Sequence, residues 1–421
     1  MSDDTAVHLL AQLPDRVHLP TGDCVVARAY GIEERVGGDA VDLTLPFARL
    51  ADELGDAEPA AARRGDDSLL AGHRVAVITN VPMHYRVPLF EAMHERVAAA
   101  GGEMRVLFLA RRHAERAWVP ETRLAFDHVF AAERHVVGEL ARYHPTMVVA
   151  GGFSPVAVRA SAYARRRRVP LGIWSGAVDL PESETTLPRR LQRKWLLGRA
   201  SFGIAYGIGA RAYLARLAPS LPVVIGRNTS VHDASAEPRP LRERLELVAV
   251  GRLVERKGFR VLVEMLRRRP GLECRLTIAG DGPERARLEA AAVQDDRIVL
   301  TGGLAPDDVR RVYEAGDVFL FPTRNEVFGH VLVEAMAAGL AAVTSTSAGA
   351  TADLCVDGRN ALVVHGHDPG AWAAALDRLA GDPDLRARLG SRAAATVAAR
   401  WTLAHSADAM IAGIRLGALV S

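Results

Sequence analysis

Two glutamates, Glu326 and Glu334, stand eight positions apart in a segment that could recognise a sugar joined to a phosphate. Glu326 is expected in a loop after the strand-like run 317–322, and Glu334 on a helix that starts near Gly329. The first turn of a helix presents N–H groups and a positive dipole end to an anion, and glycine lets a ligand approach the backbone. Carboxylates accept hydrogen bonds from sugar hydroxyls. Together these features predict a site for a nucleotide sugar.

A basic loop is expected to serve the same site. Arg252 and Lys257 follow the apolar run Leu245–Val250, which places them at the carboxyl end of a strand, where α/β sheets bind ligands. An arginine fork and a lysine point charge would together neutralise a diphosphate leaving group. The alternative is a solvated basic loop, which we expect for Arg256. Gly280, in a tight turn after a further strand-like run, either lines the nucleotide site or serves only the turn.

Four segments of the second half, in this order, resemble the signature of the retaining glycosyltransferases of family 4, or glycosyl transferases group 1. They are the run GRLVERKG at 251–258, the turn GDGP at 280–283, the Glu-x7-Glu run at 326–334 and the run DLCVDGRNALV at 353–363. The resemblance covers roughly residues 220–400, is looser in the first half and is absent from residues 1–70. It implies the GT-B fold, in which two Rossmann-like domains face each other across a cleft.

Strand-like runs that alternate with helix-length runs agree with this α/β fold class. A chain of 421 residues is also long for one domain. We predict an N-terminal extension of unknown role at 1–70, an acceptor domain at 71–222, a donor domain at 241–400 and a C-terminal helix at 401–421 that crosses back to the first domain. The proline- and charge-rich run 219–240 is expected to be the linker.

The resemblance implies roles for single residues of the donor domain. Arg252 and Lys257 would bind the diphosphate and stabilise its departure. Glu334 would hold the ribose hydroxyls, and Glu326 would support the donor sugar unless it only caps the next helix. Backbone N–H groups would contact the phosphates and the donor sugar, and these belong to Phe328, Gly329 and His330.

The implied reaction is retaining transfer of a hexosyl unit from an NDP-sugar to an acceptor hydroxyl, with a UDP-sugar as the favoured donor. The acceptor would be a small molecule, a lipid-linked intermediate or a polysaccharide precursor. The resemblance implies no metal and no further cofactor. Two alternatives stay open. One is a GT-B nucleotide-sugar epimerase, which needs no acceptor, and the other is a non-catalytic nucleotide-sugar-binding protein.

The acceptor side is expected in the first domain. The run PMHYRVPLF at 82–90 resembles a pattern of some family branches, which makes His84, Tyr85 and Arg86 candidates for acceptor or phosphate contact. Gly152, after a strand-like run, is a further candidate. Ser175 stands where many family members carry a histidine, so a protein general base is in doubt. Front-face attack, as proposed for the family, would instead pass the acceptor proton to the leaving phosphate.

Composition excludes several other classes of function. A net charge of +3 is too mild to imply binding to nucleic acid. The three cysteines, Cys24, Cys274 and Cys355, lack metal-ligand spacing and fit free thiols in a reducing cytoplasm. The acidic N-terminus is unlike a signal peptide, and no run of 18 apolar residues predicts a membrane span. We therefore expect a cytoplasmic location.

One segment, Leu187–Arg199, raises the alternative of a location at the inner face of the membrane. Leu187, Leu191 and Trp195 recur at four-residue steps beside arginine and lysine. This pattern is typical of a membrane-surface helix. It is equally typical of a helix that packs its apolar stripe on a core and exposes a basic face. We expect the second arrangement and keep peripheral membrane contact as the alternative.

Two short motifs favour other chemistry only weakly. The run GIGARA at 207–212 fits a relaxed dinucleotide fingerprint, but it closes a series of strands instead of following the first one. Asp382 and Asp384 form a D-x-D that could suggest a metal-bound diphosphate. We expect it instead to cap a helix that starts at Leu385.

Overall fold

The computed structural model describes residues 67–111, 124–178, 186–228, 234, 242 and 244–419. These residues form two compact units. Unit 1 consists of residues 67–228 and 403–419, and unit 2 of the described residues from 234 to 402. Before them, the backbone of one small sheet is assigned, with strands β1 (Arg16–His18), β2 (Cys24–Arg28) and β3 (Gly31–Val36).

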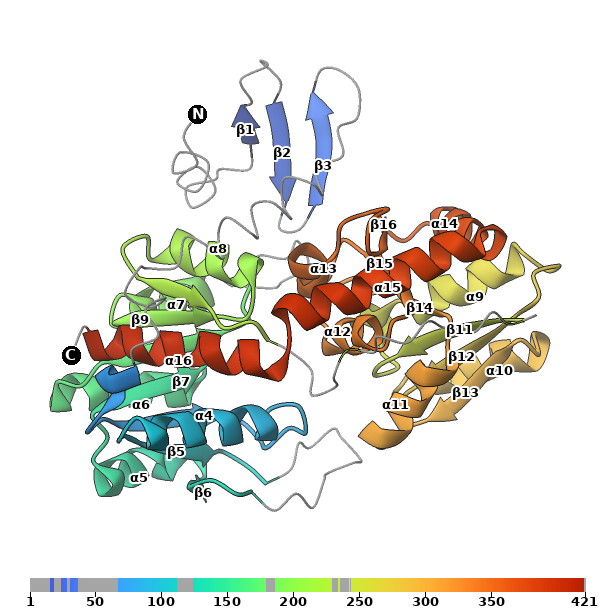
Figure 1. Cartoon of the computed structure of the whole chain (residues 1–421). Coiled ribbons are helices and arrows are strands. Elements are labelled where there is room, and N and C mark those ends of the chain that lie inside the picture. Colours follow the sequence, from blue (N-terminus) through green and yellow to red (C-terminus); the bar gives the residue numbers. More distant parts are fainter. Residues whose placement is uncertain are drawn as a thin grey trace. The chain divides into compact units, whose positions relative to one another are not determined.

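Unit 1 is built around a parallel sheet with the strand order β10-β9-β8-β7-β4-β5-β6 (Figure 1). Its strands are β4 (Arg74–Thr79), β5 (Glu103–Phe108), β6 (His128–Phe130), β7 (Met147–Gly151), β8 (Leu171–Ser175), β9 (Phe202–Ala205) and β10 (Val223–Ile225). The central strands are almost wholly buried, as expected for a parallel sheet covered on both faces. The strand order reverses at β4, and ligands bind beyond the carboxyl ends of strands at such a point.

Helices cover this sheet. They are η1 (Asp67–Leu70), α4 (Val87–Ala99), η2 (Glu133–His135), α5 (Val136–Tyr143), α6 (Pro155–Arg167), α7 (Leu187–Leu197), α8 (Ile208–Leu217) and α16 (Leu403–Leu419). Helix α6 begins at a proline, and the Ser154 hydroxyl caps it by accepting from the Ala157 N–H at 3.4 Å. Phe90 on α4 packs edge-on against Phe108, Phe126 and Trp174 in the core.

Helix α16 follows unit 2 in sequence but packs on unit 1, against α4 and the sheet (Figure 1). Two glycines permit this close approach. A β-carbon at Gly413 would come within 2.7 Å of Ile204, and one at Gly417 within 2.5 Å of Phe202. The C-terminal helix therefore completes the core of the first domain.

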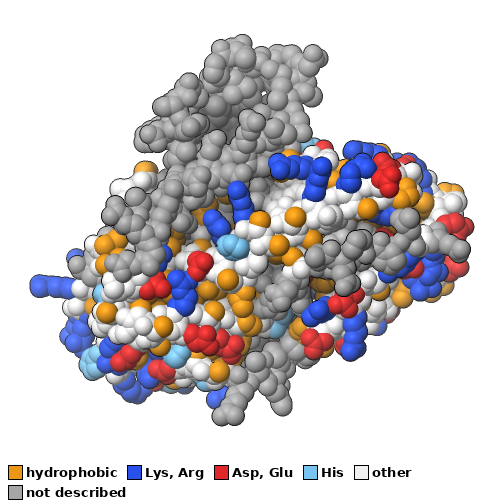
Figure 2. Space-filling view, in the orientation of Figure 1, with side chains coloured by type: hydrophobic (Ala, Val, Ile, Leu, Met, Phe, Trp, Pro, Cys, Tyr) orange, Lys and Arg blue, Asp and Glu red, His pale blue; other side chains and the backbone are white. Residues whose placement is uncertain are grey.

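Ion pairs join α16 to the start of unit 1. The buried Arg415 contacts Asp67 at 2.7 Å, and Arg96 on α4 contacts both Asp67 and Asp408. On the face shown in Figure 2, acidic and basic side chains of unit 1 lie interspersed. This mixture is ordinary for a protein surface, because neighbouring opposite charges neutralise one another.

Unit 2 has a second parallel sheet, with the order β13-β12-β11-β14-β15-β16. Its strands are β11 (Leu245–Val250), β12 (Cys274–Ala279), β13 (Ile298–Gly302), β14 (Val318–Phe321), β15 (Ala341–Ser345) and β16 (Leu362–Val364). Its helices are η3 (Glu255–Lys257), α9 (Phe259–Arg267), α10 (Arg285–Gln294), α11 (Pro306–Ala315), α12 (His330–Ala337), α13 (Gly349–Leu354), α14 (Pro369–Gly381) and α15 (Pro383–Arg400).

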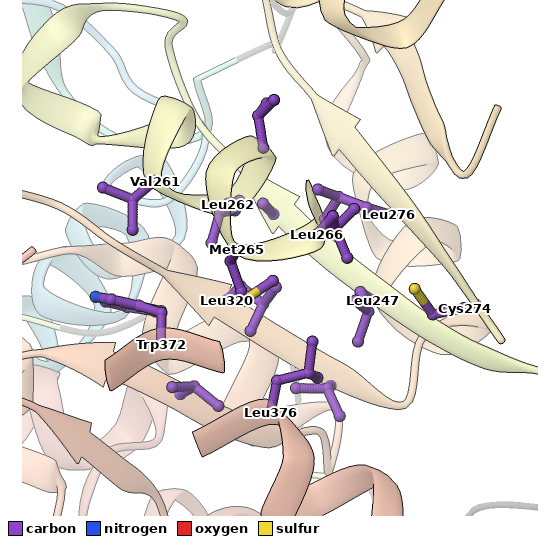
Figure 3. Close-up of a cluster of buried hydrophobic side chains, with 14 of the residues drawn as sticks. Leu247, Val261, Leu262, Met265, Leu266, Cys274, Leu276, Leu320, Trp372 and Leu376 are labelled. Carbon is purple, nitrogen blue, oxygen red and sulfur yellow. The ribbon is translucent and has the colours of Figure 1, made fainter. Parts of the chain in front are cut away.

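Alternate residues of β11 enter two separate apolar clusters, one on each face of this sheet. Leu247 joins the cluster that α9 and α14 cover, where Leu266 and Trp372 are fully buried (Figure 3). Val248 joins the cluster with residues of α12 and α15, such as Met336. Packing on both faces fixes the carboxyl ends of the strands, from which the candidate site loops emerge.

The predicted fold class is confirmed, because each unit is a Rossmann-like parallel sheet covered by helices. The first domain, however, does not end at residue 222. Strand β10 lies inside the predicted linker and pairs with β9, and unit 1 runs to Asn228. It also begins before residue 71, because Leu70 is fully buried. A three-residue strand is too short to produce a readable pattern in the sequence.

The predicted rotation of α7 is wrong. Leu187, Leu191 and Trp195 are exposed, whereas Leu196 and Leu197 face the core. Within the described residues, no helix is both long and apolar enough to cross a bilayer.

Two smaller predictions are confirmed. Asp382 caps α15, since its Oδ1 accepts a hydrogen bond from the Leu385 N–H at 2.8 Å. Cys274 and Cys355 are free, buried thiols, while the side chain of Cys24 lies outside the described residues.

Candidate functional site

The loop after β11 carries Arg252 and Lys257. The loop ends at Gly258, which has φ +72° and packs directly against the Pro322 carbonyl. A β-carbon at this position would lie 2.0 Å from that carbonyl oxygen. Only glycine allows this approach between the loop and the end of β14. The basic loop is thereby held beside the segment that leads to Glu326. Arg252 is half-buried in this loop.

Lys257 and Glu326 form a direct ion pair that is mostly shielded from solvent. The Lys257 Nζ contacts Glu326 Oε2, and the two side chains are 11% and 17% exposed. Arg256, on the outer side, approaches the same oxygen at 3.4 Å. Burial raises the pKa of Glu326, but the charge and hydrogen bond of Lys257, with help from Arg256, outweigh burial and hold that pKa below its ordinary value. Glu326 is therefore a fixed carboxylate at neutral pH.

The backbone of Glu326 is anchored independently of its side chain. Its N–H donates to the Ser347 carbonyl at 3.1 Å, and its carbonyl accepts from Gly349 N–H at 3.1 Å. Helix α12 has Gly329 at its N-cap and no side-chain cap. Glu326 therefore does not cap the next helix, which was the structural alternative.

Glu334 lies one turn into α12 and is buried, with 6% of its surface exposed. The Tyr313 hydroxyl donates to its Oε2 at 2.9 Å. Burial raises the pKa of Glu334 to about 7, which the hydrogen bond from Tyr313 only partly offsets. Near neutral pH this carboxyl is thus poised between its two protonation states.

Two glycines shape the backbone around these side chains. Gly280 has φ +152°, and a β-carbon there would lie 1.9 Å from the Gly251 carbonyl oxygen, so the β12 turn rests directly against the loop of Arg252. Gly329 has φ +107°, and a β-carbon there would lie 2.8 Å from the ring of Phe321. The start of α12 is thereby pressed against the end of β14.

Phe328 and His330 flank Gly329 at the start of α12. Phe328 is buried, and its ring packs against Trp401 with centroids 5.8 Å apart. Its side chain is therefore part of the core, and the contact of its backbone N–H with a ligand stays a prediction. His330 is half-buried, and its ring lies edge-on to that of Phe328.

Arg86 occupies an aromatic cage at the carboxyl ends of the unit 1 strands. Its guanidinium donates to the Thr79 hydroxyl at 3.0 Å and to the Tyr206 hydroxyl, and lies over Trp174 at 4.8 Å. Among the described residues, no carboxylate lies within ion-pair distance of it, and its enclosed Nε has no partner. A half-buried cation without an acidic partner suits contact with an anion.

The other acceptor-side candidates lie on neighbouring strand ends. His84 and Tyr85 precede Arg86, with their rings edge-on at 5.2 Å. Gly152, with φ +72°, follows β7 and donates to the Trp174 carbonyl at 2.8 Å. Ser175 ends β8, is 3% exposed and accepts from the Ala177 N–H at 3.0 Å, so its hydroxyl is used locally.

Three residues of these sites were not predicted, namely Tyr313, Trp174 and Tyr206. Tyr313 lies 21 positions before Glu334, on a different helix, and no spacing rule connects them. Tyr206 lies 120 positions from Arg86. One usable signal was present: tyrosine and tryptophan at the ends of apolar strands carry polar groups that need partners when buried.

Residues 244–382 match the family model described as "Glycosyl transferases group 1". The alpha-D-kanosaminyltransferase of Streptomyces kanamyceticus is 33% identical over 193 residues, with 43% of this chain and 50% of that protein covered. The D-inositol 3-phosphate glycosyltransferase of Corynebacterium diphtheriae is 36% identical over 185 residues, with 40% and 42% covered. The chain thus spans half or less of the length of these relatives.

Solved structures share the fold over more of the chain. That of HepE from Anabaena in complex with UDP has a TM-score of 0.64 and 16% identity, and covers 79% of this chain and 97% of that one. The GT-B fold and the resemblance to glycosyl transferases group 1 are therefore confirmed, while membership of family 4 stays a prediction. In the described part of the chain, no three His, Cys, Asp or Glu side chains gather in a way that could hold a metal ion.

Proposed function

We propose that this chain, a GT-B protein whose second unit carries a glycosyl transferases group 1 region, is a glycosyltransferase that uses a nucleotide sugar. The observation that carries the proposal is the shielded Lys257–Glu326 pair at the carboxyl ends of β11 and β14, beside the start of α12. We further propose a UDP-hexose donor and transfer with retention to a hydroxyl of a small-molecule, lipid-linked or polysaccharide-precursor acceptor. UDP is favoured because it is bound in the structurally similar HepE.

Lys257 and Arg252 would stabilise the diphosphate as its charge develops on departure, which is electrostatic catalysis. Glu326 holds Lys257 in place and neutralises its charge. A diphosphate would bring Lys257 a second anionic partner. Glu326 would then be a preformed carboxylate beside the donor sugar, able to accept its hydroxyls or to stabilise positive charge at the anomeric carbon.

Glu334 would bind the ribose hydroxyls through Oε1, because its Oε2 accepts the hydrogen bond from the Tyr313 hydroxyl. Its position behind the first turn of α12 supports this role, because the N–H groups of that turn would bind the phosphates at the same time. Position 175, where many family members carry a histidine, is a serine. The hydroxyl oxygen of Ser175 accepts a hydrogen bond from the Ala177 N–H, so it is not placed to act as a general base. We therefore propose that the leaving phosphate oxygen accepts the acceptor proton.

A transfer assay tests the function. Purified protein is incubated with UDP-, GDP-, ADP- and dTDP-sugars and a panel of acceptors, and the products are analysed for new glycosides and for the configuration at the anomeric carbon. New glycoside with the donor configuration supports the proposal. Turnover of the sugar nucleotide without acceptor would indicate an epimerase, and binding without any turnover would indicate a binding protein.

We expect transfer to need no divalent cation. Arg252 and Lys257 would supply the positive charge that a metal provides in other diphosphate chemistry. The measurement is the transfer rate after EDTA treatment and after re-addition of Mg²⁺ or Mn²⁺. The expected rates are equal within a factor of about two, and a loss of activity that Mn²⁺ restores would contradict the expectation.

We expect acceptors with a phosphate or carboxylate group to be preferred, because Arg86 lacks an acidic partner among the described residues. Arg86→Gln should lower kcat/KM for such acceptors about tenfold, the scale of one charge-assisted hydrogen bond. Donor KM should stay unchanged. Neutral acceptors serve as the control, and an equal loss for both classes would show that Arg86 only supports the fold.

A further inference from the structure

Helix α7 presents an apolar stripe to solvent. Leu187, Leu191 and Trp195 are 69%, 58% and 42% exposed, and their four-residue spacing places them along one side of the helix. Leu196 and Leu197 on the opposite side are buried. Single exposed apolar residues are common, but three in line on an eleven-residue helix form a patch that needs an explanation.

Polar contacts fix this rotation of α7. Arg193, on the inner side, donates to the Tyr213 hydroxyl at 2.6 Å and lies over the ring of Phe153 at 5.2 Å. Gln192 donates to the Phe153 carbonyl at 3.4 Å. These contacts, together with the buried leucines, prevent the helix from turning its apolar stripe inward.

The stripe is bordered by basic side chains of α7 and of the end of α6. The exposed basic residues of these two segments are Arg165, Arg166, Arg167, Arg168, Arg189, Arg190, Lys194 and Arg199. No acidic side chain of the described chain lies within ion-pair distance of them. These unpaired basic side chains give the described surface of α7 and the end of α6 a positive charge.

A hollow of about 400 Å³ lies between the two helices. It is lined by Arg165, Arg166, Arg199, Trp195 and Ser161, together with Ala162. The Arg199 guanidinium stacks on the Trp195 ring at 3.8 Å. The Ser161 hydroxyl is enclosed and has no hydrogen-bond partner among the described residues. Guanidinium groups around one hollow suit a phosphate group.

We propose that α7 and the end of α6 form a docking surface for an anionic phospholipid bilayer. Leucine and tryptophan side chains would enter the boundary between headgroups and acyl chains, while the arginines and lysine would contact lipid phosphates. Charge complementarity and the central apolar stripe together favour this occupant. A nucleic acid or another soluble polyanion would use the basic groups but offer no apolar phase for the stripe.

Vesicle flotation with the full chain tests this proposal without any sugar substrate, so its outcome is independent of the proposed function. Vesicles of phosphatidylcholine alone are compared with vesicles that also contain phosphatidylglycerol. We expect binding to the anionic vesicles that weakens with added salt, and little binding to the neutral ones.

Two variants separate the apolar from the basic contribution. Leu191→Ser with Trp195→Ser should lower binding to anionic vesicles about tenfold or more, because two apolar side chains no longer enter the bilayer. Arg165→Ser with Arg166→Ser should lower it similarly and flatten the salt dependence. All four residues are exposed, so the fold should survive, as circular dichroism can check. Matched controls in unit 2 are Val293→Ser and Arg310→Ser, both exposed, which should bind like the unmodified chain.

The proposal is overturned if anionic vesicles do not bind, or if neutral and anionic vesicles bind equally. It is also overturned if the Leu191 and Trp195 substitutions leave vesicle binding unchanged. Binding of soluble heparin that matches vesicle binding and persists in those apolar variants would assign the surface to a polyanion instead.

Discussion

Lys257→Ala should lower the rate of sugar transfer about 10²–10³-fold, the usual loss for one group that stabilises developing charge. The same change should also destabilise unit 2 by about 1–3 kcal/mol, because it leaves the mostly shielded carboxylate of Glu326 without its main partner. Transfer rates with the donor at saturation and urea denaturation of the variant measure the two effects separately.

A second substitution distinguishes catalysis from folding. In the double variant Lys257→Ala with Glu326→Gln, the uncompensated charge is absent, so most of the lost stability should return while transfer stays impaired. Arg310→Ala, which removes an exposed arginine paired with Glu314 on α11, is the matched control and should change neither quantity. A folded Lys257→Ala protein with near-normal turnover would falsify the assigned diphosphate role.

The sequence predicted the loops of this site but not the contacts between their side chains. Gly258 and Gly329 marked backbone turns that only glycine tolerates, and their places after apolar runs located them at strand ends. The Lys257–Glu326 pair joins residues 69 positions apart. This contact forms because β11 pairs with β14, although two other strands lie between them in the sequence. Which strands become neighbours in a parallel sheet depends on the topology of the whole domain and not on a local sequence pattern.

Helix α7 shows a different limit. Five apolar residues stand on it, and periodicity alone allows either the stripe of Leu187, Leu191 and Trp195 or the pair Leu196 and Leu197 to face the core. The choice is made by contacts with other elements, such as that of Arg193 with Tyr213. A single sequence does not contain that information in any local pattern.

Glu334→Gln should change the pH dependence of stability by about 2.5 kcal/mol between pH 5 and pH 8. The folded protein holds the Glu334 pKa at about 7, above its ordinary 4.5, so between these values the folded state binds more protons than the unfolded state. Its contribution is therefore most favourable at low pH and is lost as pH rises through 7. Glutamine does not titrate, so the free energy of unfolding of the variant should fall less over this range. Urea denaturation at both pH values measures the difference, and parallel curves would contradict the raised pKa.

The same carboxyl should make nucleotide affinity depend on pH. Ribose hydroxyls would donate to the ionised form, and at pH 6 a group with a pKa of about 7 is only about one-tenth ionised. The Kd of UDP should therefore be about tenfold weaker at pH 6 than at pH 8. In Glu334→Gln, the affinity for UDP should be lower at both pH values. The only pH dependence of Kd left in this variant should come from the protonation of UDP itself.

The Tyr313→Phe variant removes the hydroxyl that stabilises the ionised Glu334 carboxylate. The pH range over which Kd changes most should therefore move upward. Calorimetric titration at several pH values tests all three proteins. A Glu334→Gln variant that keeps the full pH dependence would show that the ribose does not engage this carboxyl, and the buried Tyr313–Glu334 pair would then be a structural feature of α11 and α12.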